Sequence, residues 1–144
     1  MCIEKTRSQR GFTLIEILIV VVILGVLGAV VVPNLLERPD QARVTAAKTD
    51  IRSLSSALDL YRLDNYNYPT TDQGLQALIT RPSGLPEAPN WNPDGYVRHS
   101  LEDPWGTPYI YTNEGQNFEI ISYGQDRTQG GEGVAADLSS NDIN

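Results

Sequence analysis

The order of apolar and polar residues divides this chain into two parts. Residues 12–32 are apolar except for Thr13 and Glu16, and no charged residue follows Glu16 until Glu37. As a helix, this run of 21 residues would be roughly 31 Å long, which is about the thickness of the hydrocarbon core of a bilayer. We therefore expect one membrane crossing here.

A different pattern follows the apolar run. Apolar residues now recur at spacings of four, three, four and three, namely at Ala47, Ile51, Leu54, Leu58 and Tyr61. This spacing is typical of one face of an amphipathic helix. If both parts belong to one helix, it runs from Phe12 to about Asp64 and is roughly 80 Å long. We expect it to bend or partly unwind at Pro33, and Pro39 either repeats that defect or starts a fresh helix.

The residues after this helix predict short elements joined by loops. Thr70 and Gln73 have the spacing of a capping box, so a short helix should begin there. Residues 80–98 contain four prolines and should form a loop. Residues 109–112 and 118–123 are strand-like and should pair as an antiparallel hairpin.

The tail from Gly124 onward is rich in glycine and aspartate, so we expect no regular structure there. Taken together, these elements predict an α+β fold, in which a long N-terminal helix packs on a small antiparallel sheet.

The residues before the apolar run form a basic leader. They hold three bases and one acid, so the positive-inside rule places residues 1–11 in the cytoplasm and exports the rest. An ordinary signal peptide has the same plan. This apolar run is longer than a usual signal, carries a carboxylate and lacks a clear small-x-small cleavage site. Its length favours a retained anchor, although the pattern leaves both alternatives open.

Composition and charge narrow the function classes. The net charge of −7 disfavours nucleic acid and anionic lipid as partners and suits divalent cations. The only cysteine, Cys2, lies in the leader, so the exported part cannot form a disulfide, and a metal or oligomerisation is the usual substitute. His99 is the only histidine and has no evident catalytic partner, so we do not expect an enzyme.

Glu16 is explained by neither an anchor nor a signal peptide. An ionised side chain near hydrocarbon costs at least ~2.5 kcal/mol. Something must therefore neutralise this carboxylate.

Three motifs resemble those of a known family. Arg10-Gly11-Phe12-Thr13-Leu14-Ile15-Glu16 resembles the prepilin-type processing site that all type IV pilin-like proteins share. Residues 68–78, from Tyr68-Pro69-Thr70 to Leu78, and the segment Asp103-Pro104-Trp105-Gly106 resemble the major pseudopilins of the type II secretion system. The resemblance covers nearly the whole chain.

This resemblance implies a type IV pilin-like fold and a structural subunit of the type II secretion pseudopilus. It implies cleavage between Gly11 and Phe12 by a prepilin peptidase, followed by methylation of the new amine on Phe12. Residues 1–11 would be the leader, residues 12–37 the apolar transmembrane and filament-core helix, and residues 38–144 the periplasmic globular domain.

The resemblance also implies how the subunit is used. The monomer waits in the inner membrane as a single-pass protein until it joins a helical homopolymer, together with minor pseudopilins and an inner-membrane assembly platform. Growth of this filament drives export of folded proteins across the outer membrane. The assembly residues are Phe12, Glu16 and Pro33. Within one helix the Phe12 amine and the Glu16 carboxylate lie roughly 6 Å apart along the axis, and in a staggered bundle the carboxylate can meet a neighbour's amine, which would neutralise both charges.

A second candidate site lies in the tail, where Asp126 and Asp137 flank a glycine-rich segment. Calcium takes six to eight oxygen ligands, but this spacing lacks the alternating acids of an EF-hand and is a weak signal alone. The resemblance implies a calcium site formed by Asp126, Asp137 and the carbonyls of Tyr123 and Thr128. Ala136 replaces an acid found in some relatives, and residues 138–141 depart from the usual family ending.

Two other functions stay open. A type IV pilin that forms a surface fibre shares the first motif, but such pilins typically close the C-terminal loop with a disulfide, and the tail here has no cysteine. A membrane-anchored periplasmic enzyme or binding module is the third class, and it would tolerate a change at Glu16 that a filament subunit would not.

Overall fold

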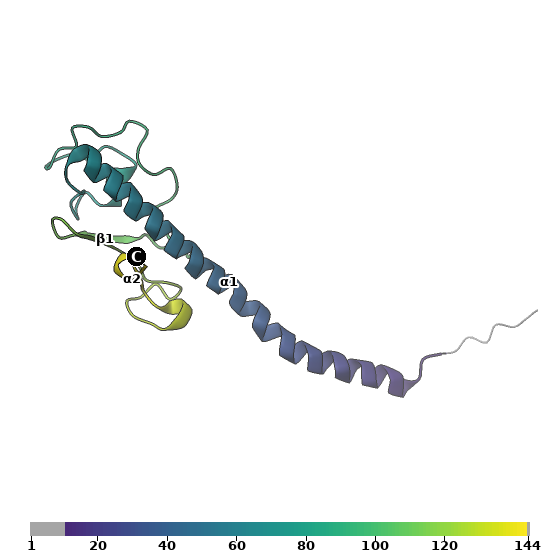
Figure 1. Cartoon of the computed structure of the whole chain (residues 1–144). Coiled ribbons are helices and arrows are strands. Elements are labelled where there is room, and N and C mark those ends of the chain that lie inside the picture. Colours follow the sequence, from purple (N-terminus) through teal and green to yellow (C-terminus); the bar gives the residue numbers. More distant parts are fainter. Residues whose placement is uncertain (1–10, 144) are drawn as a thin grey trace, which may run out of the picture. The chain divides into compact units, whose positions relative to one another are not determined.

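The computed structural model of the protein describes residues 11–143, apart from the side chains of residues 30–38. The elements follow the order α1 (Leu14–Asn65), the 3-10 helix η1 (Leu75–Leu78), β1 (Ile110–Asn113), β2 (Phe118–Ser122), the 3-10 helix η2 (Gly133–Ala135), β3 (Leu138–Ser139) and α2 (Ser140–Ile143) (Figure 1). The chain divides into two compact units between Arg38 and Pro39. The predicted leader lies outside the described residues except for Gly11.

The first unit contains the N-terminal part of α1. Thr13 caps this helix, because its hydroxyl and its carbonyl both accept from the Glu16 amide, at 3.3 and 3.1 Å. Every large apolar side chain from Phe12 to Leu27 is exposed, at between 47% and 86%. Within the described residues, no helix combines the length and the hydropathy needed to cross a membrane.

α1 is helical from Leu14 to Asn65 without interruption at either internal proline. The alternative in which Pro39 starts a fresh helix is therefore not what the structure shows, and Pro33 does not unwind the assigned helix. Each proline removes one intrahelical hydrogen bond, and the bonds on either side keep the helix continuous. The helix ends where Tyr66 takes a left-handed backbone conformation (φ 71°) and its amide donates to the Arg62 carbonyl at 2.7 Å.

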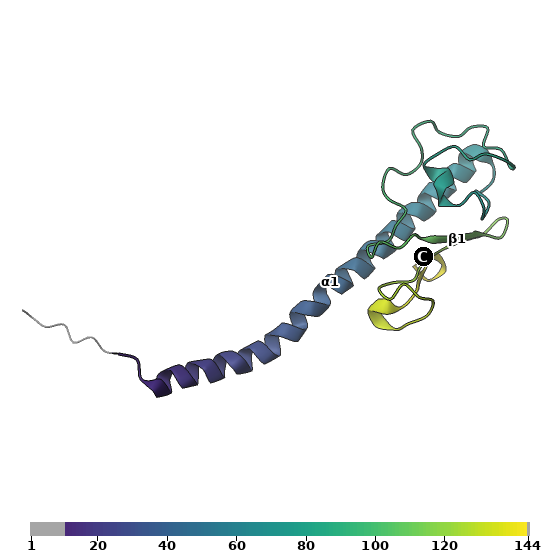
Figure 2. The same ribbon diagram turned by 180° about the vertical axis from the view of Figure 1, so that it is seen from behind.

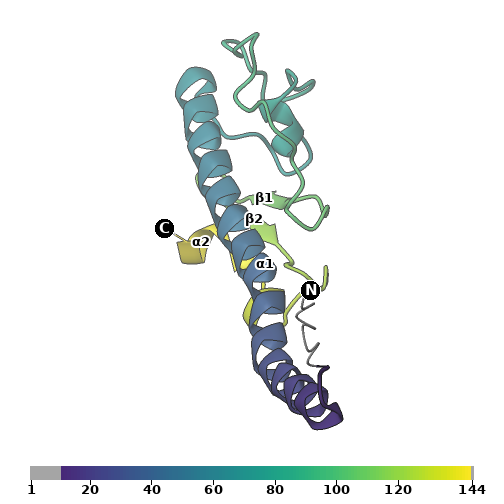
Figure 3. The same ribbon diagram turned by 90° about the vertical axis from the view of Figure 1, so that its right-hand side faces the viewer.

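The second unit has one hydrophobic core, and the predicted stripe of α1 forms its centre. Ala47, Ile51, Leu54 and Leu58 are completely buried. The same cluster contains side chains from all three strands, namely Tyr111, Ile120 and Leu138. Figure 3 shows β1 and β2 beside this part of α1. The prediction of an amphipathic helix packed on a small sheet is confirmed.

The sheet is antiparallel with the strand order β1-β2-β3. β1 pairs with β2 with Tyr111 opposite Ile120, which confirms the predicted hairpin. The prediction that the tail lacks regular structure is wrong in part, because β3 pairs with β2 through Ser122 and Leu138, and α2 follows directly. This pairing joins residues far apart in sequence, and a strand of two residues is too short to show a periodicity.

The predicted capping box is present, but the helix after it differs from the prediction. The Gln73 amide donates to the Thr70 hydroxyl at 3.1 Å, and the Thr70 amide donates to the Gln73 side chain at 3.0 Å. Gly74 then takes a positive φ of 60°, which an α-helix cannot include, so only a short 3-10 helix follows. Residues 80–98 contain no helix or strand, as predicted, and lie with η1 around the C-terminal end of α1 (Figures 1 and 2).

Candidate functional site

The predicted processing site is accessible. Gly11 and Phe12 precede the first turn of α1, and Phe12 is 80% exposed. A Cβ atom built at Gly11 would meet nothing within 4 Å, so nothing in the described chain requires glycine there. A requirement for glycine would therefore come from an enzyme that recognises this segment.

Glu16 lies in the first turn of α1. Its side chain is exposed, and so are the apolar side chains around it. Its backbone amide is held by Thr13, while its carboxylate is available to another molecule. The neutralisation of Glu16 by a processed Phe12 amine concerns mature chains and their neighbours, so it stays a prediction. The side chain of Pro33, the third predicted assembly residue, lies outside the description.

The candidate metal loop runs from Tyr123 to Asp137 and folds back on itself (Figure 1). The Gly130 amide donates to Asp137 Oδ2 at 2.9 Å. The neighbouring Gly131 lies beside the other carboxylate, since a Cβ built there would be 3.2 Å from Asp126 Oδ2. Asp126 Oδ1 accepts from the Thr128 amide at 3.1 Å. The fold therefore brings both predicted acids to the same pair of glycines.

A cation would satisfy an oxygen that the protein leaves without a partner. Asp137 Oδ1 is buried, and among the described residues no group donates to it. A buried acceptor of this kind is costly unless a ligand or water satisfies it. Over residues 11–143, no cluster of three or more His, Cys, Asp or Glu side chains could hold a metal. A cation in this loop would therefore combine two carboxylates with main-chain or water oxygens, which suits calcium.

Two glycines allow close packing of the backbone within the loop. Gly131 has φ +89°, and a Cβ there would overlap the Ala135 carbonyl oxygen. Gly124 has φ +66°, and its Cβ would lie 3.0 Å from the Ala136 carbonyl oxygen. Side chains at these positions would displace the backbone that leads into Asp137.

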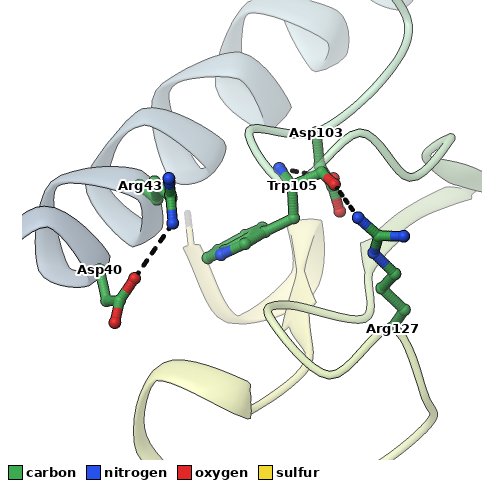
Figure 4. A network of polar contacts seen from close by, with 5 residues as sticks. All are labelled: Asp40, Arg43, Asp103, Trp105 and Arg127. Atoms are coloured by element: carbon green, nitrogen blue, oxygen red, sulfur yellow. Dashed lines mark hydrogen bonds and ion pairs between the residues drawn. The ribbon is translucent and has the colours of Figure 1, made fainter.

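The Asp103–Gly106 motif, which entered above only as a resemblance to a family, forms a hydrogen-bonded turn in the structure. Asp103 is only 5% exposed, and its Oδ1 accepts from the Trp105 amide at 3.1 Å and from the Thr107 amide at 2.9 Å. Arg127, from the metal loop, donates to the Trp105 carbonyl at 2.7 Å. Figure 4 shows this turn and Arg127 side by side. The sequence does contain a signal for this turn. An aspartate can accept from the backbone amide two residues later, and a glycine next to it often closes such a turn.

The pKa shifts of Tyr109 and Tyr111 are the largest among the tyrosines of the core. Burial raises the pKa of Tyr109 far above its ordinary value, and the nearby Asp50 carboxylate, 3.3 Å from its hydroxyl, adds to the shift. Burial likewise raises the pKa of Tyr111, whose hydroxyl donates to the Pro69 carbonyl at 2.8 Å. Neither tyrosine is a predicted ligand of the metal loop.

Comparison with known proteins matches both parts of the chain to family models. Residues 34–141 match the family described as type II secretion system (T2SS), protein G, and residues 6–32 match the prokaryotic N-terminal methylation motif.

Individual relatives agree with these matches. The type II secretion system core protein G of Pseudomonas aeruginosa is 52% identical over 138 residues, which cover 94% of this chain and 97% of that protein. The protein of the same name from Vibrio cholerae is 48% identical, over 95% of this chain and 94% of its own. The crystal structure of the major pseudopilin from the type 2 secretion system of enterohaemorrhagic Escherichia coli matches with a TM-score of 0.63 and 43% identity, over 76% of this chain and 96% of that one.

Proposed function

The chain belongs to the type II secretion system protein G family, and on that premise we propose that it is a structural subunit of the secretion pseudopilus rather than an enzyme. The subunit polymerises through the N-terminal part of α1 into a periplasmic filament that drives export of folded proteins. The rival function, a surface fibre, is not favoured, because the relatives that match over nearly their whole length are secretion proteins.

One structural observation carries this proposal. The large apolar side chains from Phe12 to Leu27 are all exposed, with Glu16 alone charged among them. A surface of this kind is stable in water only when something covers it. Copies of the same helix, staggered so that Glu16 of one meets the processed amine of another, would cover the apolar surface and pair the charge together. A contact of this head-to-tail type propagates as an open helix.

The proposal extends to location and partners. Before assembly, residues 12–37 anchor the subunit in the inner membrane in a single pass, with the globular domain in the periplasm. A prepilin peptidase removes the leader after Gly11, and the amine of Phe12 is then methylated. Minor pseudopilins and the inner-membrane assembly platform are the expected further partners.

We also propose that the loop binds calcium through Asp126, Asp137 and the carbonyls of Tyr123 and Thr128. The buried, unpartnered Oδ1 of Asp137 supports this. Calcium would supply positive charge between the two acids and fix the loop that leads into β3. Its role is structural, and it takes part in no reaction.

A substitution at Glu16 tests the filament. In cells that express the complete secretion apparatus, Glu16→Ala should still be processed, so that the purified chain has a mass that begins at Phe12 with one added methyl group. It should yield no sedimenting filaments, because the pairing group is lost. Glu114→Ala, which removes an exposed acid in the hairpin turn, is the matched control and should assemble normally. Filaments from the Glu16 variant at the wild-type level would contradict the assembly mechanism.

A further inference from the structure

A chain of hydrogen bonds links the Asp103–Gly106 turn to the start of the candidate metal loop. Asp103 Oδ2 accepts from the Ser122 hydroxyl at 2.6 Å. The same hydroxyl accepts from the Gly124 amide at 3.2 Å. Ser122 is 1% exposed, so water does not compete for these bonds. Tyr123, whose carbonyl is a proposed calcium ligand, lies between Ser122 and Gly124 in the chain, so the bond from the Gly124 amide to the Ser122 hydroxyl spans it.

A second link reaches the loop on the far side of Tyr123. Arg127 follows the proposed ligand Asp126 and precedes the proposed ligand Thr128, and it has a left-handed backbone conformation with φ 59°. This conformation is unfavourable for a residue with a Cβ. The bond from its guanidinium to the Trp105 carbonyl at 2.7 Å holds it in place (Figure 4).

We propose that the Asp103–Gly106 turn is a positioning element for the calcium loop, acting through Ser122 and Arg127. This inference rests on the proposed calcium site. Both links end on the loop segment that carries three of the four proposed ligands, and neither Ser122 nor Arg127 offers an oxygen to the metal. The turn presets the conformation of residues 123–128, so calcium does not have to order them when it binds.

The alternative is that these bonds only stabilise the core. Asp103 and Ser122 are buried, so their loss would lower stability in either case. A substitution of Arg127 can distinguish the positioning role from a purely stabilising one, because Arg127 is exposed and lies outside the hydrophobic core. A positioning role predicts that its removal weakens calcium binding while the metal-free protein stays about as stable as before.

The test measures the calcium dissociation constant of the full chain, purified in detergent, by isothermal titration calorimetry. Arg127→Ala and Ser122→Ala should each raise the constant about 10- to 100-fold, the range typical of residues that orient metal ligands. Arg127→Lys, which keeps a donor on a flexible stem, should recover part of the affinity. The control is Tyr111→Phe, which removes a buried hydrogen bond to Pro69 outside the loop and should leave the constant unchanged.

Melting in chelator supplies the second readout. Arg127→Ala should melt within about 4 °C of the wild type there, as surface substitutions do. If the wild type binds calcium and Arg127→Ala binds it equally well, the positioning role is wrong and the calcium site stands. If the wild type shows no calcium binding, the site itself is wrong and the positioning role falls with it. Should Ser122→Ala fail to fold, the Arg127 pair still decides between these outcomes.

Discussion

The substitution Asp137→Asn should lower the stability of the globular unit in calcium but not in chelator. The Oδ1 atom of Asp137 is buried without a donor among the described residues, whereas Oδ2 accepts from the Gly130 amide. An asparagine keeps an oxygen for Gly130 and replaces the unpartnered, charged oxygen by a neutral amide that can donate to main-chain carbonyls. In chelator, this exchange removes the free-energy cost of a buried oxygen that has no hydrogen-bond donor.

The size of the effect follows from ordinary magnitudes. An unsatisfied buried polar group costs about 1–3 kcal/mol, so in chelator the variant should equal the wild type or exceed it by up to that amount. Calcium at about 100 times its dissociation constant adds about 2.7 kcal/mol to the wild type, and the variant loses most of this gain with its charged ligand. In a domain of this size each kcal/mol moves the melting temperature by roughly 4–8 °C.

The measurement is the melting temperature of the full chain in detergent, with chelator and with saturating calcium, for the wild type, for Asp137→Asn and for a control variant. The control is Asp72→Asn, which makes the same charge change at an exposed position outside the loop and should shift neither melt. If Asp137→Asn shifts the melting temperature by the same amount with chelator and with calcium, stabilisation by calcium does not depend on the Asp137 carboxylate and the metal argument is refuted.

Two further predictions concern the core. Leu58 is completely buried, whereas Leu63 on the same helix is 74% exposed. In urea unfolding, Leu58→Ala should therefore lower the free energy of unfolding by about 2–5 kcal/mol, and Leu63→Ala should lower it by less than about 0.5 kcal/mol. Equal losses for the two variants would contradict the packing of α1. Because burial raises the pKa of Tyr109, this phenol stays protonated in the folded state above the pH of about 10 at which it ionises when unfolded. The stability that Tyr109 contributes is therefore complete below pH ~10 and falls above it by about 1.4 kcal/mol per pH unit. Tyr109→Phe should flatten the decline of the melting temperature at alkaline pH. An unchanged slope would show that ionisation of Tyr109 does not cause this decline.

Local patterns in the sequence predicted most of the fold. The burial of Ile51, Leu54 and Leu58 follows from their spacing, since a helix of 3.6 residues per turn brings such positions to one face. The hairpin and the capping box at Thr70 and Gln73 are likewise encoded within a few residues. The processing motif is also local, and its exposure before α1 agrees with the role that its resemblance implies.

The errors concern features that short patterns describe poorly. The capping box predicted a short helix from Thr70 onward, but only the 3-10 helix Leu75–Leu78 forms, because the backbone of Gly74 is left-handed. At Pro39 the sequence left two alternatives open, and the structure has the continuous helix rather than a fresh start, because the neighbouring hydrogen bonds of a long helix outweigh the loss of one donor. β3 and α2 formed in a tail expected to be irregular, because β2 offered a pairing edge that no residue of the tail reveals.

The apolar segment with its single acid, the amphipathic stripe and the residue types of the metal loop are all readable from the chain, since each depends on neighbours within a turn or two. The buried oxygen of Asp137 that lacks a donor, and the link from Asp103 to the loop through Ser122, become visible only in the folded unit. Hydrogen bonds between distant residues depend on how the whole unit packs around one core. Their partners therefore leave no periodic trace along the chain.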